Sequence, residues 1–184
     1  KSQTTATIGS KMISVYLGLG SNIEPALEYL SRGLGALQAH PRISLLATSA
    51  VYHSVAIGPQ QADYLNLAIL IVTDLEPLTL LSLCQEIESE QGRVRGERWG
   101  PRTLDIDLLY SPDVSCDDET LILPHPELHR RLFVIAPLLE LPRADTITVH
   151  GLTIEHYAAQ LSSDEVRLST YRWDGIQFRD TSTV

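Results

Sequence analysis

Apolar residues recur with two different periods along the chain, and together these periods predict a mixed α/β protein. Leucines at helical spacing follow Pro25 and Pro77, and proline is a favoured first helical residue, so both stretches are predicted helices. Four other runs are apolar or β-branched and are predicted strands: 13–19, 43–52, 64–73 and 104–110.

The predicted element order is β-α-β-β-α-β, which is that of the ferredoxin-like α+β fold, an antiparallel sheet with helices packed on it. Beyond the fourth strand we expect C-terminal additions to this core. They are a short apolar run at 121–123, helical stretches at 133–141 and 154–161, and a small hairpin that begins at 146–149 and turns at His150-Gly151. The residues from Ser162 onward show no clear period.

Length and composition indicate one soluble globular domain, because the chain has 184 residues, of which 43% are hydrophobic and 20% charged. Met12 is the only methionine and stands just before the first predicted strand. We therefore expect a domain at 12–161, an extension or vector remnant at 1–11, and a tail at 162–184.

No apolar run approaches the roughly 20 residues that span a bilayer, so no membrane segment is expected. The polar N-terminus does not resemble a secretory signal. With only two cysteines, Cys84 and Cys116, a reducing compartment is the simplest interpretation, and we expect a cytoplasmic protein.

The charge of the chain is unevenly distributed. The net charge is −9, yet the segment 93–102 carries four arginines and one glutamate. A basic island in an acidic chain predicts a local anion site. It does not favour a long nucleic acid, which needs a broad basic face.

Asp105 and Asp107 follow this island directly, on a predicted strand. Residues i and i+2 of a strand project from the same face, so the two carboxylates can converge on one or two cations. Paired carboxylates suit Mg²⁺, which often shares its sites with substrate phosphates, and arginine suits the phosphates themselves. The alternative is an acidic strand face paired with neighbouring arginines.

Trp99 lies between Arg98 and Gly100, in a loop whose glycines would let it close. A tryptophan there can stack on a flat ring or exclude water from a site. Several other polar residues have both a structural and a functional interpretation. The two have similar weight for Tyr64 and Asn66 on one strand face, whereas the sequence alone favours the structural one for Gln85 and Glu88 on one helix face and for His125 between two prolines. The asparagine amide would suit the polar edge of a purine- or pterin-like ring.

The chain lacks three motifs that would indicate other kinds of functional site. The chain has no phosphate loop ending in Gly-Lys-Ser/Thr, no Cys/His cluster of metal-binding spacing, and no Gly-x-Ser-x-Gly elbow.

The chain resembles the 6-hydroxymethyl-7,8-dihydropterin pyrophosphokinases of folate biosynthesis from about Ile13 to Leu161. The resemblance is carried by several blocks in order: Leu19-Gly20-Ser21-Asn22, Gly58-Pro59-Gln60 with Asp63 to Asn66, Glu88 before Gly92 to Arg95, Arg98 to Asp107, and Pro124-His125-Pro126 with Arg131 and Phe133. The tail from Ser162 lies outside it.

The resemblance implies an ATP-dependent diphosphotransferase. ATP and 6-hydroxymethyl-7,8-dihydropterin would give AMP and the pterin diphosphate, with the hydroxymethyl oxygen attacking the β-phosphorus. Two Mg²⁺ ions would be held by Asp105 and Asp107, which together with Arg93 and Arg102 are the expected catalytic residues. No general base is evident.

The resemblance also implies two sets of binding residues. Expected ATP contacts are Gln85, Glu88, Arg95, Arg98, Trp99, Leu108, His125 and Arg131. Expected pterin contacts are Ser54, Val55, Ile57, Tyr64, Asn66 and Phe133, with the ring of Phe133 stacked on the pterin. The expected partners are these two small molecules, with no nucleic acid and no membrane, and the chain is expected to be a monomer with a dimer as the alternative.

Two other function classes stay open at this point. A two-metal phosphohydrolase would hydrolyse ATP without any pterin. A nucleotide-sensing or protein-interaction module would bind its ligand without turnover.

Overall fold

The computed structural model describes residues 11–56, 60–93, 100–163 and 166–182, and a six-stranded antiparallel sheet forms its centre. Strand β1 (Ile13–Ser21) lies between β4 (Tyr64–Thr73) and β5 (Asp105–Tyr110). The outer side of β4 pairs with both β2 (Ile43–Thr48) and β3 (Tyr52–Ser54), and β3 in turn pairs with β10 (Val166–Leu168).

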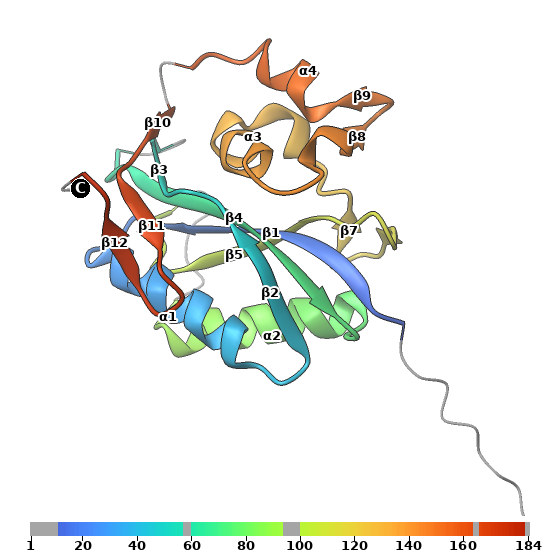
Figure 1. Ribbon diagram of the computed structural model, residues 1–184, viewed down its shortest axis with the longest axis horizontal. Helices are drawn as coiled ribbons and strands as arrows, with labels where there is room; N and C mark the ends of the chain where they lie inside the picture. Colours follow the sequence, from blue (N-terminus) through green and yellow to red (C-terminus); the bar gives the residue numbers. More distant parts are fainter. Residues whose placement is uncertain (1–10, 57–59, 94–99, 164–165, 183–184) are drawn as a thin grey trace, which may run out of the picture.

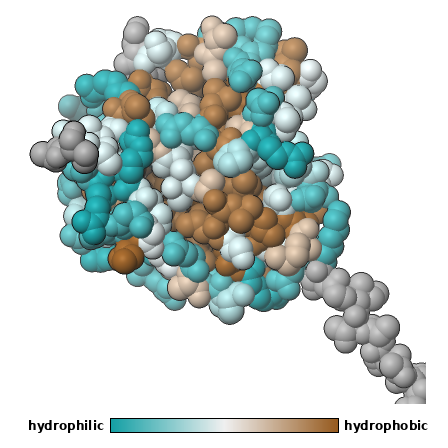
Figure 2. Space-filling view, viewed as in Figure 1, coloured by the Kyte–Doolittle hydropathy of each residue, from teal (hydrophilic) through white to brown (hydrophobic). Residues whose placement is uncertain are grey.

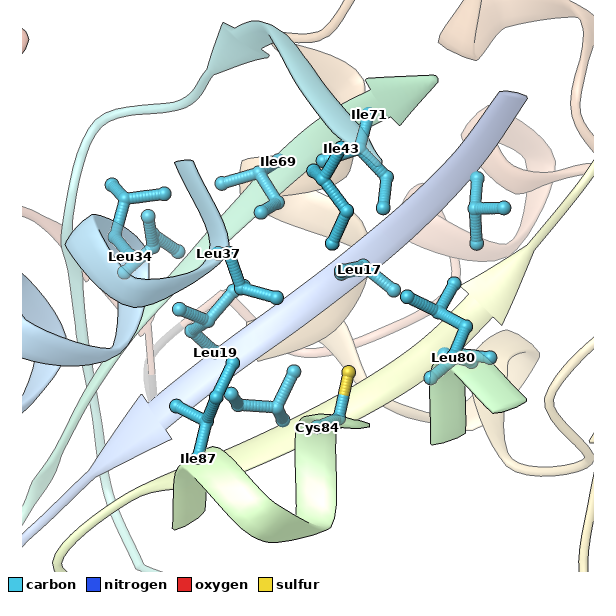
Figure 3. Packing of buried hydrophobic residues seen from close by; sticks show 14 of the residues in the cluster. Leu17, Leu19, Leu34, Leu37, Ile43, Ile69, Ile71, Leu80, Cys84 and Ile87 are labelled. Carbon is cyan, nitrogen blue, oxygen red and sulfur yellow. The ribbon is translucent and has the colours of Figure 1, made fainter. Parts of the chain in front are cut away.

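Helices α1 (Ala26–Ala39) and α2 (Pro77–Glu90) cover one face of this sheet (Figure 1). Their apolar stripes pack on the alternate residues of β1 and β4 that point toward them. Leu17 and Leu34 are fully buried there, and Cys84 lies in the same cluster (Figure 3). Burial of about 25 cal/mol per Å² of apolar surface makes this cluster the main source of stability.

The opposite face carries a smaller lobe (Figure 1). It contains α3 (Leu132–Leu139), α4 (Ile154–Ala158), 3₁₀ turns at Leu128–Arg130 and Ala144–Thr146, and a hairpin of β8 (Thr148–Val149) and β9 (Leu152–Thr153). A second buried cluster joins Tyr16 and Leu109 of the sheet to Ile135 and Leu138 of α3. A two-stranded ribbon, β6 (Cys116–Asp117) with β7 (Ile122–Leu123), links β5 to this lobe.

The C-terminal segment is built into the fold. After β10, the hairpin of β11 (Tyr171–Trp173) and β12 (Phe178–Asp180) runs beside α1 (Figure 1). Phe178 is only 8% exposed and belongs to the main core cluster. The tail, for which the sequence showed no clear period, therefore adds short strands to the fold.

The expectation of an antiparallel sheet with packed helices is confirmed, and the strand predicted at 64–73 has those bounds. The strand predicted at 43–52 is wrong in its length, because the chain leaves the sheet after Thr48 and returns as β3. The carbonyl of Ala68 and the amide of Ser49 hydrogen-bond across this break at 2.9 Å. The helix predicted at 154–161 ends at Ala158.

The edge formed by β2 is irregular. Its register against β4 shifts between Leu45 and Ala47, and Leu46 at this bulge is 58% exposed. Figure 2 shows apolar side chains gathered on this face, in front of the strands labelled β2 and β4 in Figure 1. Within the described part of the chain, no helix is long and apolar enough to cross a membrane.

Candidate functional site

A cavity of about 330 Å³ lies between the sheet and α3. Two glycines of β1, Gly18 and Gly20, form part of its floor. A Cβ at Gly18 would lie 3.3 Å from Leu109, and one at Gly20 would lie 3.2 Å from the Asn66 Oδ1. β1 thus has bulky side chains toward α1 and α2 and glycines at the two positions that face the cavity, and these glycines leave room for the cavity.

Strand β5 directs Asp105 and Asp107 into the cavity. The alternation of the strand confirms the expectation drawn from its sequence, because Ile106 and Leu108 point to the main core on the other face. Leu109, which follows a register shift, lines the cavity beside the two carboxylates. The i, i+2 spacing therefore brings both acids to one side of one cavity.

The Asp105 carboxylate is held by two arginines. Its Oδ1 lies 2.8 Å from the Arg93 Nη1, and its Oδ2 lies 2.5 Å from the Arg102 Nη1. The Arg93 guanidinium also pairs with Glu88 of α2. Both carboxylate oxygens of Asp105 are thus ion-paired in this structure, one with Arg93 and the other with Arg102.

Glu88 is buried, with an exposed fraction of 6%. Its Oε1 accepts a 2.7 Å hydrogen bond from the Ile106 backbone N–H, so the side chain ties α2 to β5 between the two aspartates. Burial raises the pKa of Glu88, while the backbone hydrogen bond and Arg93 oppose the rise. The charge of Glu88 is therefore used inside the protein, where it positions Arg93 and the backbone of β5.

Asp107 has a strongly perturbed carboxyl. Burial, and then the charge of Asp105, raise its pKa to about 7, although Arg131 and Arg102 act in the other direction. Two crowded carboxylates of this kind gain from a shared cation. Among the described residues no group of three or more His, Cys, Asp or Glu side chains could hold a metal ion. The pair still fits Mg²⁺, which commonly takes one or two protein carboxylates and fills its other positions with water and phosphate oxygens.

Asn22 is a connecting residue to which the sequence assigned no role. It is 5% exposed, and its Oδ1 accepts a 2.8 Å bond from the Arg102 N–H, while its own N–H donates to the Arg102 carbonyl at 3.1 Å. Its Nδ2 donates to Gln61 and to the Ala62 carbonyl. Asn22 thereby fixes the backbone of a catalytic candidate, a role that depends on contacts between residues eighty positions apart in the sequence.

Tyr64 and Asn66 face the cavity from β4, as their alternation predicted. The Asn66 Nδ2 donates to the Ser54 Oγ at 2.7 Å, and both side chains are buried. The Tyr64 hydroxyl donates to the Gly100 carbonyl at 3.2 Å, which joins this wall to the end of the arginine segment. Val55 and Phe133 complete this part of the lining.

His125 and Arg131 reach the cavity from the segment before α3. Burial, and then Arg131, lower the pKa of His125, which favours the neutral imidazole. Its Nδ1 accepts a 3.2 Å bond from the Glu127 N–H, which leaves the Nε2 as the protonated nitrogen. The Arg131 guanidinium lies 6.0 Å from the centre of the Phe133 ring.

Some candidate residues do not line this cavity. Leu108 is 2% exposed in the main core, and Gln85 on α2 is not part of the lining. Their predicted contacts with a nucleotide stay predictions. Ile57, Arg95, Arg98 and Trp99 lie outside the described residues.

Comparison with protein families matches residues 16–143 to the family described as 7,8-dihydro-6-hydroxymethylpterin-pyrophosphokinase (HPPK). Proteins named 2-amino-4-hydroxy-6-hydroxymethyldihydropteridine pyrophosphokinase are among the relatives. The one from Haemophilus influenzae is 44% identical over 144 residues, 74% of this chain and 90% of the relative. The one from Bacillus subtilis is 43% identical over 127 residues, 68% of this chain and 76% of the relative.

A solved structure with the same fold is a Plasmodium falciparum HPPK-DHPS chain crystallised with pteroate. It is 12% identical, has a TM-score of 0.69, and the match covers 97% of this chain and 50% of that chain. The family match ends at residue 143, before α4 and the three C-terminal strands.

Proposed function

We infer that this chain, which belongs to the 7,8-dihydro-6-hydroxymethylpterin-pyrophosphokinase family, transfers diphosphate from ATP to 6-hydroxymethyl-7,8-dihydropterin. The products are AMP and the pterin diphosphate, and the reaction belongs to folate biosynthesis. The observation that carries this inference is that one cavity holds paired carboxylates, arginines, and a wall of aromatic and amide side chains. In the reaction the hydroxymethyl oxygen bonds to the β-phosphorus. The bond between that phosphorus and the α,β-bridging oxygen breaks, and this oxygen stays with AMP.

Two Mg²⁺ ions bound by Asp105 and Asp107 would neutralise triphosphate charge and orient the reacting oxygens. The pairings of Asp105 suggest how the arginines take part. Each oxygen of Asp105 lies against one guanidinium group, and a Mg²⁺ ion bound to the same carboxylate would be repelled by both positive charges. We therefore propose that Arg93 and Arg102 leave Asp105 when the nucleotide complex forms and donate to phosphate oxygens instead. The active site would then exchange one set of ion pairs for another, without leaving a buried charge unpaired.

The nucleotide is proposed to lie along the arginine side of the cavity. His125 would donate from its Nε2 and Arg131 from its guanidinium to phosphate oxygens. The resemblance also assigns ATP contacts to Gln85, Arg95, Arg98, Trp99 and Leu108. For Glu88 we propose an indirect contribution through Arg93, because its carboxylate is already bonded to Arg93 and to the Ile106 N–H.

The pterin is proposed to lie between Tyr64, Asn66 and Phe133, with backbone contacts from Ser54, Val55 and Ile57. The Asn66 amide supports this placement, since its Nδ2 already bonds the Ser54 Oγ and its orientation is thereby fixed. A fixed amide can both donate to and accept from the polar edge of a pterin. The ring of Phe133 would stack on the flat face of the pterin.

We further propose that the core has ferredoxin-like topology, which the strand order β3–β4–β1–β5 supports. Residues 12–161 are proposed as the pyrophosphokinase domain, with 1–11 as an extension and 162–184 as a tail. A monomer in the cytoplasm is the proposed state of the protein. Sedimentation of the purified chain would test the monomer.

The experiment that tests the proposed function is an AMP-release assay with ATP and Mg²⁺, run with and without 6-hydroxymethyl-7,8-dihydropterin. AMP release that requires the pterin supports diphosphate transfer. AMP release without the pterin would indicate a phosphohydrolase instead. Binding of either ligand without turnover would indicate a sensing module.

A further inference from the structure

The short strand β3 is held from both sides. Tyr52, His53 and Ser54 pair with β4 on one side, and on the other they pair with Leu168, Arg167 and Val166 of β10. Without β10, these three residues would form an unsupported edge at the cavity wall. The family match ends at residue 143, so this support comes from a segment beyond the part of the chain that the family description covers.

β3 carries the hydroxyl that orients Asn66. Ser54 is 4% exposed, and its Oγ accepts the 2.7 Å bond from the Asn66 Nδ2. The Asn66 Oδ1 is directed toward Gly20 on the cavity floor. A displacement of β3 would remove the partner of the Asn66 amide and alter the wall formed by Ser54 and Val55.

The segment that follows β10 is itself anchored at two further places, the residue before β3 and helix α1. The Ser169 N–H donates to the Val51 carbonyl at 2.9 Å, and the Val51 N–H donates to the Tyr171 carbonyl at 3.3 Å. Farther on, the Trp173 Nε1 donates to the Gln38 Oε1 of α1 at 3.2 Å, and the ring packs edge-on against Phe178 at 5.1 Å. The tail thus connects α1 to the wall of the cavity (Figure 1).

The tail also closes a smaller cavity beside the first one. Val166, Leu161 and Ser162 line it together with four residues that line the main cavity: Ser54, Val55, Arg131 and Phe133. Val166 therefore shares this cavity with three residues proposed to contact the pterin, Ser54, Val55 and Phe133, and with Arg131, which is proposed to contact ATP.

We propose that β10 is a positioning element of the pterin site, and that it acts by holding β3 so that Ser54 keeps the Asn66 amide in its binding orientation. The hairpin β11–β12 fastens β10 to α1. This inference rests on the proposed function for its ligand. It predicts a larger effect on pterin binding than on nucleotide binding, because β10 pairs with β3, which carries Ser54, whereas the arginines paired with Asp105 belong to neither strand.

The test uses Arg167→Pro, which places a residue without an N–H at the centre of the three-residue pairing. Arg167→Ala is the matched control, since it removes the same exposed side chain and keeps the strand backbone. We expect the Kd for the pterin to rise about fivefold to tenfold in Arg167→Pro, as for the loss of one buried hydrogen bond, with a smaller change in the Kd for ATP. The control should bind both ligands like the wild type.

Amide hydrogen exchange at residues 52–54 and 66 of the ligand-free protein supplies a readout that needs no pterin. It should be faster in Arg167→Pro than in Arg167→Ala. If the proposed function fails, wild-type protein does not bind the pterin, yet the exchange result still tests the support of β3. If the positioning role fails, wild-type and Arg167→Pro proteins bind the pterin equally, or exchange at these residues is unchanged.

Should Arg167→Pro not fold, Trp173→Ala replaces it, because Trp173 is distant from the cavity and fastens the hairpin to α1. A rise of about twofold to threefold in the pterin Kd is expected there, for loss of one exposed anchoring bond. An unchanged pterin Kd in this variant, with a lowered Tm, would overturn the proposal and leave the tail as a purely stabilising addition.

Discussion

The Arg93 guanidinium lies 2.8 Å from the Asp105 carboxylate, and the same nitrogen pairs with Glu88. Helix α2 is thereby linked to strand β5 through Arg93, in addition to the direct hydrogen bond from the Ile106 N–H to Glu88. The orientation of Arg93 depends on Glu88, which is buried beneath it. A substitution of Glu88 can therefore separate its effect through Arg93 from a direct contact between Glu88 and the nucleotide.

Glu88→Gln should slow the reaction with little effect on pterin binding. The amide keeps the shape of the side chain but loses the charge that holds Arg93. We expect kcat to fall about 10- to 100-fold, as for groups that orient a metal ligand. Steady-state kinetics with both substrates provide the measurement, and Glu86→Gln on the exposed face of the same helix is the control. A raised KM for ATP with normal kcat would instead favour direct contact between Glu88 and the nucleotide.

Asp105→Ala and Asp107→Ala should each abolish most turnover in saturating Mg²⁺. Each variant removes a carboxylate from the proposed cation site. We expect kcat to fall by at least about 10²- to 10³-fold, which is the loss typical for removal of one preorganised electrostatic group from an active site. The AMP-release assay measures it, and Asp117→Ala, an exposed residue of β6, should behave like the wild type. Near-normal activity of either cavity variant would contradict the two-metal proposal.

Ser54→Ala should weaken pterin binding while leaving ATP binding intact. The substitution removes the acceptor of the 2.7 Å bond from the Asn66 Nδ2. The loss of one such bond costs about 0.5–1.5 kcal/mol, which corresponds to a twofold to twelvefold rise in the pterin Kd. Equilibrium titrations with each ligand distinguish the two effects, and equal weakening of both would point to a general disturbance of the sheet.

Cys84 should resist thiol reagents in the folded protein. Burial, and then Glu88, raise the pKa of its thiol to about 12, so almost no thiolate forms at pH 8. Cys116 is partly exposed, and both cysteines are free. Titration with a chromogenic disulfide reagent should detect one reactive thiol in native protein and two in denaturant. Rapid reaction of two thiols under native conditions would count against the packing around α2.

Gly33→Ala and Gly35→Ala should change stability in opposite directions, although both lie in α1. A Cβ at Gly33 would lie 2.5 Å from Leu104, which is fully buried, whereas a Cβ at Gly35 would meet nothing within 4 Å. We expect the free energy of unfolding to fall by roughly 1–2 kcal/mol for Gly33→Ala and to rise by about 0.5–1 kcal/mol for Gly35→Ala. Urea denaturation of both variants measures the difference, and a stabilised Gly33→Ala variant would show that Leu104 can move aside.

Much of the fold was predictable because long elements carry their own signal. β4 and α2 have many residues of consistent period, and Asp105 with Asp107 follow from the period of β5. The tail carries no such signal, because β10, β11 and β12 have three residues each. Their pairing depends on contacts with Val51 and Gln38, more than a hundred positions away in sequence.

The sequence predicted which residue types form the site better than it predicted the contacts between them. The sequence placed Tyr64, Asn66 and the aspartates on the correct faces of their strands. The resemblance assigned Glu88 a direct contact with ATP, whereas the fold buries its side chain. One turn of helix does not reveal from sequence alone which polar residue points inward. The use of Asn22 as a backbone partner of Arg102 likewise depends on tertiary contact.

The sheet ends on this side in two short elements, the three-residue strand β10 beside β3 and the bulged strand β2. A long, regular strand edge invites pairing with the edge of another molecule, and short edge strands and bulges discourage it. A chain shortened before β10 would present β3 as the edge beside the irregular β2. We expect such a chain to self-associate more readily than the full chain as its concentration rises.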